Sequence, residues 1–180
     1  MPSTLPAPYD SAEPHAACRI VQAPAVPTAV VRRTGFPVSR MPKLMDAVFP
    51  HLVEALASAG VQAIGPAFAL HHRFPVDDAD LEVGVPVDRP LEEAIVLPSG
   101  VRVEGSQLPQ GRVAIRSHLG GYGGLSETWG AMTEEIGDAG EQSRFPIWEF
   151  YVSNPAEVAR PSELRTDLVT LLEERAATRA

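Results

Sequence analysis

The sequence predicts an α+β fold in which two strand–helix–strand–strand units form one antiparallel sheet, with both helices on one face and a ligand cleft on the other. Three observations predict it. Two segments carry apolar residues at three- and four-residue steps, as amphipathic helices do, among short β-branched and alternating segments. The order strand, helix, strand, strand occurs twice. Hydrophobic residues make up 44% of the chain, which is enough for a globular core.

The domain organisation is predicted from the ends of this pattern. Residues 1–16 are rich in Pro, Ser and Ala, and we expect them to form a disordered tail. One domain is expected over residues 17–175, with halves of about 17–99 and 100–175. The tail has neither the basic start nor the apolar run of a secretory signal.

Charge and composition narrow the class of partner. The chain has 15 Lys and Arg against 23 Asp and Glu, and the resulting net charge of −8 repels nucleic-acid phosphates. No run approaches the roughly 18 apolar residues of a membrane span. Cys18 is the only cysteine, which leaves no internal disulfide and favours a cytoplasmic protein stabilised by packing. We therefore expect neither nucleic acid nor a membrane as partner.

The first half is predicted to place strands around one helix. Arg40–Ala59 carries an apolar stripe and stops before Gly60, which predicts the helix. Pro50 predicts a kink or restart inside it, because proline removes a backbone hydrogen bond. The turn-rich segment Pro75–Asp78 predicts an antiparallel hairpin. The predicted strands of this half are Cys18–Ala23, Val26–Thr34, Pro66–Phe74 and Ala79–Val87.

The second half repeats this order after an acidic, loop-like segment at Asp88–Ser99. Its helix is predicted over about Tyr122–Gly137, with Trp129 on the apolar stripe and hence in the core. Leu108–Gln110 separates two strands that we expect to pair with each other. The predicted strands of this half are Gly100–Gln107, Gly111–Leu119, Pro146–Ser153 and Leu164–Leu172.

The most informative stretch is the strand at residues 147–152. Side chains alternate between the faces of a strand, and here one face is wholly apolar while the other holds a carboxylate beside a phenol. The two sets are Trp148, Phe150 and Val152, and Ile147, Glu149 and Tyr151. The apolar set suits packing under the helices. The second set is then expected to form the floor of the cleft on the opposite face.

Glu149 carries the binding hypothesis. A carboxylate buried among apolar neighbours is unfavourable in its charged form unless a partner compensates it. A cationic ligand could be that partner, and Tyr151 could add a cation–π or stacking contact of ~0.5–2 kcal/mol. The alternative interpretation is a solvent-facing glutamate on a half-exposed strand.

Four further residues are candidate walls of the cleft. Glu82 stands beside Gly84, which leaves room for a ligand, although an ordinary exposed glutamate is the alternative. His71 faces the cleft by strand alternation. Tyr122 lies in a glycine-rich turn before a helix, and Phe36 holds the comparable place in the first half.

No metal or cofactor is expected. His71 and His72 are adjacent in a strand and point to opposite faces, so they cannot readily share a metal ion. The acidic residues that follow them suit a solvated turn. The glycines around Tyr122 lack the lysine of a phosphate-binding loop and the spacing of a dinucleotide site.

Three segments together resemble a known family. HLGGYGGLSETW, DLEVGVPV and WEFYVSNP are similar, in order and spacing, to motifs of the GyrI-like small-molecule-binding domains. This family also supplies the effector-binding domain of AraC- and MerR-type regulators. The similarity covers about Val26 to Leu172.

The resemblance implies a duplicated, SHS2-like fold with a ligand cleft between the halves. It implies that Glu149 is the cleft-floor glutamate that meets cationic or polar aromatic compounds. It also favours Tyr151 and, less strongly, Glu82 and Tyr122. About 25 residues precede the fold, too few for a DNA-binding domain, so we expect a stand-alone member.

Three functions remain open at this point, and for one of them, a protein-interaction role such as binding gyrase, the sequence offers no exposed apolar stripe or charged arm. The first is binding or sequestration of small aromatic, often cationic or electrophilic, compounds, as in multidrug binding. The alternative is an enzyme similar to the hydrolases that open cyclopropane-containing natural products. In that case Glu149 would help to activate water and Tyr151 would polarise the leaving group.

Overall fold

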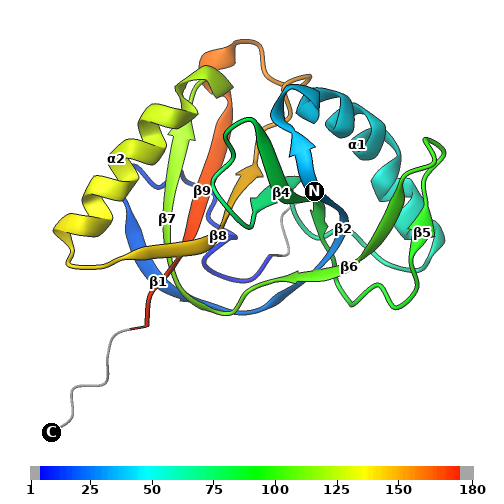
Figure 1. Cartoon of the computed structure of the whole chain (residues 1–180), viewed down its shortest axis with the longest axis horizontal. Coiled ribbons are helices and arrows are strands. Elements are labelled where there is room, and N and C mark those ends of the chain that lie inside the picture. The colour runs from blue at the N-terminus through cyan, green and yellow to red at the C-terminus, as the bar shows by residue number, and fades with distance from the viewer. Residues whose placement is uncertain (1–4, 175–180) are drawn as a thin grey trace, which may run out of the picture.

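The computed structural model describes residues 5–174 and contains one antiparallel sheet in the order β1-β7-β9-β8-β3-β4-β2-β6-β5, with two helices packed on it (Figure 1). This confirms the α+β prediction. The strands are β1 (Arg19–Ala23), β2 (Val26–Pro37), β3 (Phe68–His71), β4 (Asp78–Pro86), β5 (Ile95–Val96), β6 (Arg102–Leu108), β7 (Gly111–Leu119), β8 (Ser143–Tyr151) and β9 (Arg165–Leu172). The helices are α1 (Met41–Ser58) and α2 (Leu125–Asp138).

The duplication is visible in the sheet order. The units β2-α1-β3-β4 and β7-α2-β8-β9 are arranged so that β3 and β8 pair in the middle, where Ala69 stands opposite Glu149. From this central pair, the first half continues outward through β4 to β2, and the second half continues outward through β9 to β7. The centre of the sheet is therefore the junction of the two halves.

The two halves exchange one strand each. β6 pairs with β2 of the first half, and β1 pairs with β7 of the second half. The prediction that the strands around Leu108–Gln110 pair with each other was therefore wrong. Pro109 and Gln110 do not form a hairpin turn, because β6 and β7 continue one another along the ribbon made by β1 and β2. In Figure 1 this double ribbon sweeps along the base of the molecule.

Both helices lie on the same face of the sheet, as predicted (Figure 1). α1 packs its buried face, which includes Val48 and Leu52, on Val83 and its neighbours. α2 packs Met132 and Ile136 on the far half of the sheet. α1 continues through Pro50 without a restart; Pro50 is exposed, so the carbonyl it leaves without a partner can be hydrated.

The second face of the sheet is covered by the N-terminal segment, which we call the strap (Leu5–Ala17). Leu5 and Tyr9 are buried in one apolar cluster with Trp148 and Phe150, and the Tyr9 ring centroid lies 5.3 Å from that of Phe150. The predicted disordered tail is wrong from Leu5 onward, and residues 1–4 lie outside the described chain. Leu5 and Tyr9 supply the apolar cover that this face needs.

Trp148 and Phe150 thus lie beneath the strap, and the prediction that they pack under the helices was wrong. Strand alternation separates two sets of side chains correctly, but it does not say which set faces the helices. Glu149 and Tyr151 consequently stand on the helix face. Val152 lies just beyond β8 and is exposed.

A polar cluster joins the strap to β7 and β9 of the second half. The Arg165 guanidinium donates two hydrogen bonds to the Asp167 carboxylate and a third to the Ala12 carbonyl. Ser117 donates to Asp167 through its hydroxyl, and that hydroxyl accepts from the His15 N–H. Because Arg165 and Asp167 are both buried, the strap is held by charge-assisted bonds as well as by packing.

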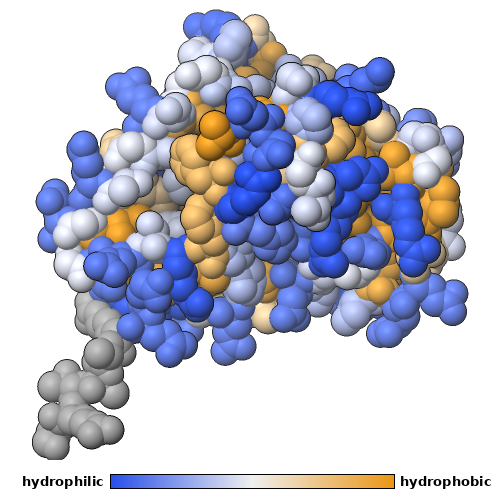
Figure 2. Space-filling view, viewed as in Figure 1, coloured by the Kyte–Doolittle hydropathy of each residue, from blue (hydrophilic) through white to orange (hydrophobic). Residues whose placement is uncertain are grey.

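Within residues 5–174, no helix is both long and apolar enough to cross a membrane. The same part of the chain contains no group of three His, Cys, Asp or Glu side chains placed to hold a metal ion. On the face in Figure 2, hydrophobic patches alternate with hydrophilic side chains. Over the described chain, Phe74, Val76 and Phe145 are among the exposed large apolar residues.

Candidate functional site

A cleft of about 930 Å³ opens on the helix face, between the first half of α1 and the start of α2. The prediction that the cleft lies on the face opposite the helices was wrong. That face is filled by the strap and by the aromatic side chains of β8, whereas the helices leave the ends of β3 and β8 uncovered between them. The lining residues are Met41, Pro42, Met45, Asp46, Phe49, Pro50, Pro66, Ala67, Tyr122, Leu125, Tyr151, Val152, Ser153, Asn154, Pro155 and Glu157.

The cleft has an adaptable apolar wall and few hydrogen-bonding groups. Met41, Met45 and Phe49 follow one another at steps of four on α1, so their side chains form one stripe toward the cleft. Methionine side chains are flexible and polarizable and adjust to ligands of irregular shape. Four of the lining residues are prolines, which offer no backbone N–H. Such a wall suits an apolar ligand body.

Glu149 lies behind this lining, in a hydrogen-bonded group of three side chains. The Trp129 indole N–H donates to Glu149 Oε1 at 2.8 Å, and the Tyr151 hydroxyl donates to Oε2 at 3.2 Å. Trp129 reaches the carboxylate from α2, while Glu149 and Tyr151 share one face of β8. Both donors are neutral, so the carboxylate is oriented without being neutralised.

Burial sets the electrostatics of this group. It raises the pKa of the Glu149 carboxyl above its usual range, and the hydrogen bonds from Trp129 and Tyr151, together with the nearby His118, only partly oppose that effect. Burial, reinforced by the nearby Glu149 carboxylate, also raises the pKa of the Tyr151 phenol well above its usual range. The two charged side chains of the cleft lining are acidic, Asp46 and Glu157. The site is therefore electronegative and holds one half-buried acid.

Tyr122 contributes the second aromatic ring. Its ring centroid lies 5.8 Å from that of Tyr151 in an edge-to-face arrangement with an interplanar angle of 81°. Tyr122 opens a short 3₁₀ turn, Tyr122–Gly124, that leads directly into α2. Burial and the Glu149 carboxylate raise the pKa of its phenol. The structure thus brings Glu149, Tyr151 and Tyr122 together, as the sequence predicted.

Glu82 does not join them. It is buried on the opposite face of the sheet, where its Oε1 accepts from Arg32 Nη2 at 3.0 Å and lies 3.1 Å from His72 Nε2. It is therefore a partner in an ion-pair cluster, and its predicted role as a cleft wall was wrong. The alternation that separates it from Leu81 and Val83 places it away from the helices.

The remaining predicted walls lie on the helix face but outside the cleft lining. His71 pairs with Ile147 across the centre of the sheet, and neither lines the cleft. Burial, followed by the neighbouring His72, lowers the pKa of His71. Phe36 packs at the edge of the core under α1, with the Arg40 guanidinium 5.9 Å from its ring centroid.

Sequence reasoning missed Trp129 and the α1 stripe. Trp129 was assigned to the core because it continues the apolar stripe of α2; its indole nitrogen gave no sign of a buried carboxylate within reach. The Met41, Met45 and Phe49 positions belong to the same amphipathic pattern that predicted α1. Their spacing could have identified them, had the cleft been placed between the helices.

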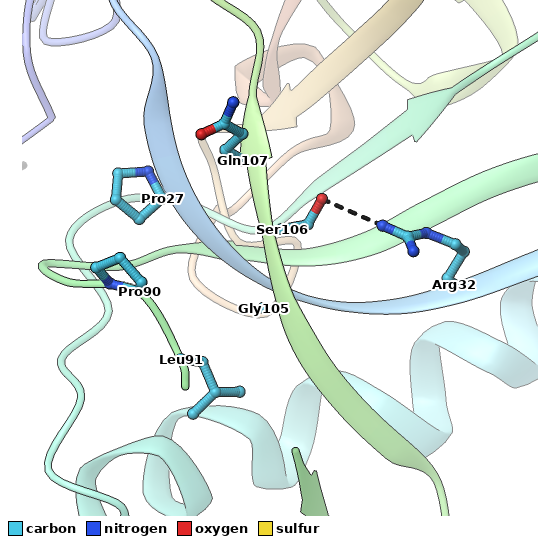
Figure 3. A pocket seen from close by; sticks show the side chains of 7 residues that line it. All are labelled: Pro27, Arg32, Pro90, Leu91, Gly105, Ser106 and Gln107. Atoms are coloured by element: carbon cyan, nitrogen blue, oxygen red, sulfur yellow. Dashed lines mark hydrogen bonds between the residues drawn. The ribbon is translucent and has the colours of Figure 1, made fainter. Parts of the chain in front are cut away.

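A second hollow is shallower and less suited to a ligand (Figure 3). It has a volume of about 380 Å³ and is lined by Arg32, Leu91 and Ser106, among others. Its cationic group is already paired, because Arg32 contacts Glu82 at 3.0 Å and Glu104 at 3.1 Å. The cleft between the helices is the stronger candidate.

Comparison with known proteins identifies the domain type. The family model for the GyrI-like small molecule binding domain matches residues 16–172. No curated protein matches the sequence significantly.

Several solved structures share the fold. The C-terminal domain of EcmrR superimposes with a TM-score of 0.69 at 15% identity, over 88% of this chain and 98% of that one. In the EcmrR–DNA complex the TM-score is 0.70 at 16% identity, and the match covers 88% of this chain but only 57% of EcmrR. A hydrolase from Listeria innocua matches with a TM-score of 0.59 at 13% identity, over 90% and 94% of the two chains. SAV2435 bound to tetraphenylphosphonium matches with 0.56 at 8% identity, over 87% and 93%.

Proposed function

Because the chain belongs to the GyrI-like family of small-molecule-binding domains, we propose that it binds small aromatic cations in the cleft between α1 and α2. Such binding would serve to capture or sequester drug-like or toxic compounds. The partner is then a small molecule rather than nucleic acid, in keeping with the net charge of −8. A single cysteine and stability from packing fit a reducing cytoplasm.

One observation carries this proposal: a half-buried carboxylate whose hydrogen-bond partners are both neutral. Glu149 accepts from Trp129 and Tyr151, and neither donor brings a positive charge. A cation in the cleft would place a positive charge near this carboxylate, in surroundings where water screens less than in bulk solvent. Tyr122 and Tyr151 would add cation–π contacts. The proposed ligand is therefore both positively charged and aromatic.

The tetraphenylphosphonium complex of SAV2435 supports the choice of probe. This compound carries a delocalised positive charge inside four phenyl rings and has no hydrogen-bond donor. The charge and the phenyl rings match a cleft that is mostly apolar and whose charged side chains are acidic.

The test is isothermal titration of tetraphenylphosphonium and of triphenylphosphine oxide, an uncharged aryl analogue. Glu149→Gln keeps the shape and the acceptor for Trp129 but removes the charge. We expect it to weaken tetraphenylphosphonium binding about 10-fold, or ~1.4 kcal/mol, and to leave the uncharged analogue unaffected.

Glu54→Gln is the matched control, because it removes one charge from the exposed side of α1, outside the cleft lining. It should bind the cation like the wild type. Equal affinity of the wild type and Glu149→Gln for the cation would contradict the proposed role of the carboxylate.

A second candidate function is hydrolysis of strained, electrophilic rings such as cyclopropanes. The Tyr151–Glu149 hydrogen bond at the base of the cleft favours it, because a carboxylate with a raised pKa is a better base. Glu149 would accept a proton from water as the water oxygen bonds to a ring carbon. The ring C–C bond would break, and Tyr151 would polarise or protonate the leaving side.

Mass spectrometry of such a compound after incubation tests this activity. The expected product has gained one water molecule, and Glu149→Gln and Tyr151→Phe should each abolish its formation. Recovery of unchanged compound across several cyclopropanes would leave ligand binding as the function.

A further inference from the structure

His118, at the end of β7, uses both of its ring nitrogens to hold neighbouring backbone in place. Its Nε2 lies 3.0 Å from the Gly121 carbonyl oxygen, and since a carbonyl can only accept, Nε2 carries the hydrogen and donates it. Its Nδ1 lies 2.7 Å from Thr128 Oγ1, and that hydroxyl lies 3.5 Å from the Gly124 carbonyl oxygen. One buried ring thus joins the turn after β7 to the first turns of α2.

The turn held by His118 has little else to fix its shape. It contains four glycines around Tyr122, and Gly120 has a φ of +133°, where side chains are strained. Its backbone hydrogen bonds run from Gly120 N to the Leu164 carbonyl, from Gly124 N to the Gly121 carbonyl, and from Leu125 N to the Tyr122 carbonyl. A Cβ at Gly124 would lie 2.8 Å from His118 Cε1, so the imidazole occupies the space that this glycine leaves.

This turn carries the outer aromatic wall of the cleft. Tyr122 is 45% exposed, and its described ring contact is with Tyr151. His118 and Tyr151 stand in one cross-strand row, each opposite Thr166 of β9. The row fixes His118 relative to the cleft floor, and the two hydrogen bonds of the ring transmit that position to the turn.

We propose that His118 is a positioning residue for the ligand cleft: by holding the glycine turn, it keeps Tyr122 against the ligand and so sets the affinity for aromatic compounds. The effect on affinity rests on the proposed function. The holding of the turn does not, because it concerns the protein without ligand.

The first measurement is hydrogen–deuterium exchange without ligand. His118→Leu removes both hydrogen bonds while filling most of the volume, and Thr128→Val removes one of them with little change in shape. Both should speed exchange in peptides spanning residues 119–125 and leave β9 unchanged. His51→Leu, an exposed histidine on α1, is the matched control. Unchanged exchange at the turn in folded His118→Leu and Thr128→Val would overturn the proposal.

The second measurement is a double-mutant cycle on the dissociation constant of tetraphenylphosphonium. Tyr122→Ala should weaken binding about 3- to 30-fold, the range for loss of one cation–π contact. His118→Leu should weaken it by a similar factor. The double variant should bind no worse than Tyr122→Ala alone, because both changes remove the same contact. Losses that multiply would show that His118 acts apart from Tyr122 and would overturn the proposal.

Rescue separates positioning from general stability. The amide nitrogen of His118→Gln can again donate toward the Gly121 carbonyl, so this variant should recover part of the affinity that His118→Leu loses. If the wild type binds no aromatic cation at all, the proposed function is overturned, and the exchange measurement still decides whether His118 holds the turn.

Discussion

At the scale of single residues, the Glu149 carboxylate is kept in an environment that does not suit its charge. Burial raises its pKa, and the two neutral donors, Trp129 and Tyr151, compensate only in part. A residue held in this way lowers the stability of the free protein while it improves the binding of a cation. Sites of this kind commonly trade stability for function.

The first prediction concerns how the destabilising effect of the Glu149 charge depends on pH. A carboxyl whose folded pKa lies above its unfolded value destabilises the fold as pH rises through the folded pKa. Glu149→Gln should therefore melt at a higher temperature than the wild type at neutral pH. The difference should shrink as pH falls below the unfolded pKa of glutamate, about 4.3, where Glu149 is neutral in both states.

Thermal melts of both proteins between neutral and acidic pH provide the measurement. Tetraphenylphosphonium affinity of the wild type should fall over the same window, because protonation removes the charge that attracts the cation. A melting difference that stays constant with pH would mean that burial does not raise the pKa of Glu149.

At this scale, the sequence predicted the chemistry of β8 better than its orientation. Strand alternation put Glu149 and Tyr151 together, and the structure does so. Alternation could not show which set of side chains faces the helices, because it only separates the residues of a strand into two sets. The face was decided by Leu5 and Tyr9, which cover Trp148 and Phe150. The proline-rich composition around Leu5 and Tyr9 predicts a disordered tail, so the sequence does not reveal that these two residues pack on the sheet.

At the scale of elements, the strap is the segment with the clearest local determinants. Leu5 lies against Gly65, where an added Cβ would stand 2.6 Å from Leu5 Cδ1. Because Gly65 has no side chain, it leaves the space that the Leu5 side chain occupies. Regular patterns predicted both helices and most strands, but an irregular segment such as the strap has no period by which to recognise it.

The second prediction tests the packing of Leu5 against Gly65. Gly65→Ala should lower the free energy of unfolding by about 1–3 kcal/mol through overpacking against Leu5. Leu5→Ala should also destabilise the protein, by no more than the ~2–5 kcal/mol of a fully buried leucine. The double variant should be less destabilised than the sum of the two, because the smaller residue 5 makes room for the new methyl group.

Urea unfolding of the three variants gives these energies. Gly137→Ala on α2 is the control, since its added methyl group meets nothing within 4 Å and only raises helix propensity. Additive losses at residues 5 and 65 would show that the strap does not depend on this contact.

At the scale of the whole molecule, the cleft lies where the two halves meet. β3 and β8 pair at the centre of the sheet, and α1 and α2 approach this junction from opposite sides (Figure 1). The duplicated order predicted such a junction. The exchange of β1 and β6 between halves was not predicted, because it depends on long-range pairing that no local pattern specifies.

The third prediction concerns ligand-dependent stability of the whole domain. A ligand that contacts both halves binds the folded state alone, and at 100 times its dissociation constant it adds ~2.7 kcal/mol. For a chain of 180 residues this corresponds to a rise in melting temperature of about 5–10 °C. Differential scanning fluorimetry with tetraphenylphosphonium measures it, with triphenylphosphine oxide as the uncharged comparison. A shift equal for both compounds would argue against charge recognition.

The strap also constrains the order in which the protein can be made. Leu5 and Tyr9 leave the ribosome well before Trp148 and Phe150, on which they rest. The apolar cluster on this face therefore cannot be completed until the strands that carry Trp148, Phe150 and Leu171 have emerged. Until then, these side chains are available to other hydrophobic surfaces, chaperones among them. Closure of the strap is thus expected to be a late step in folding, because contacts so distant in sequence are slow to form.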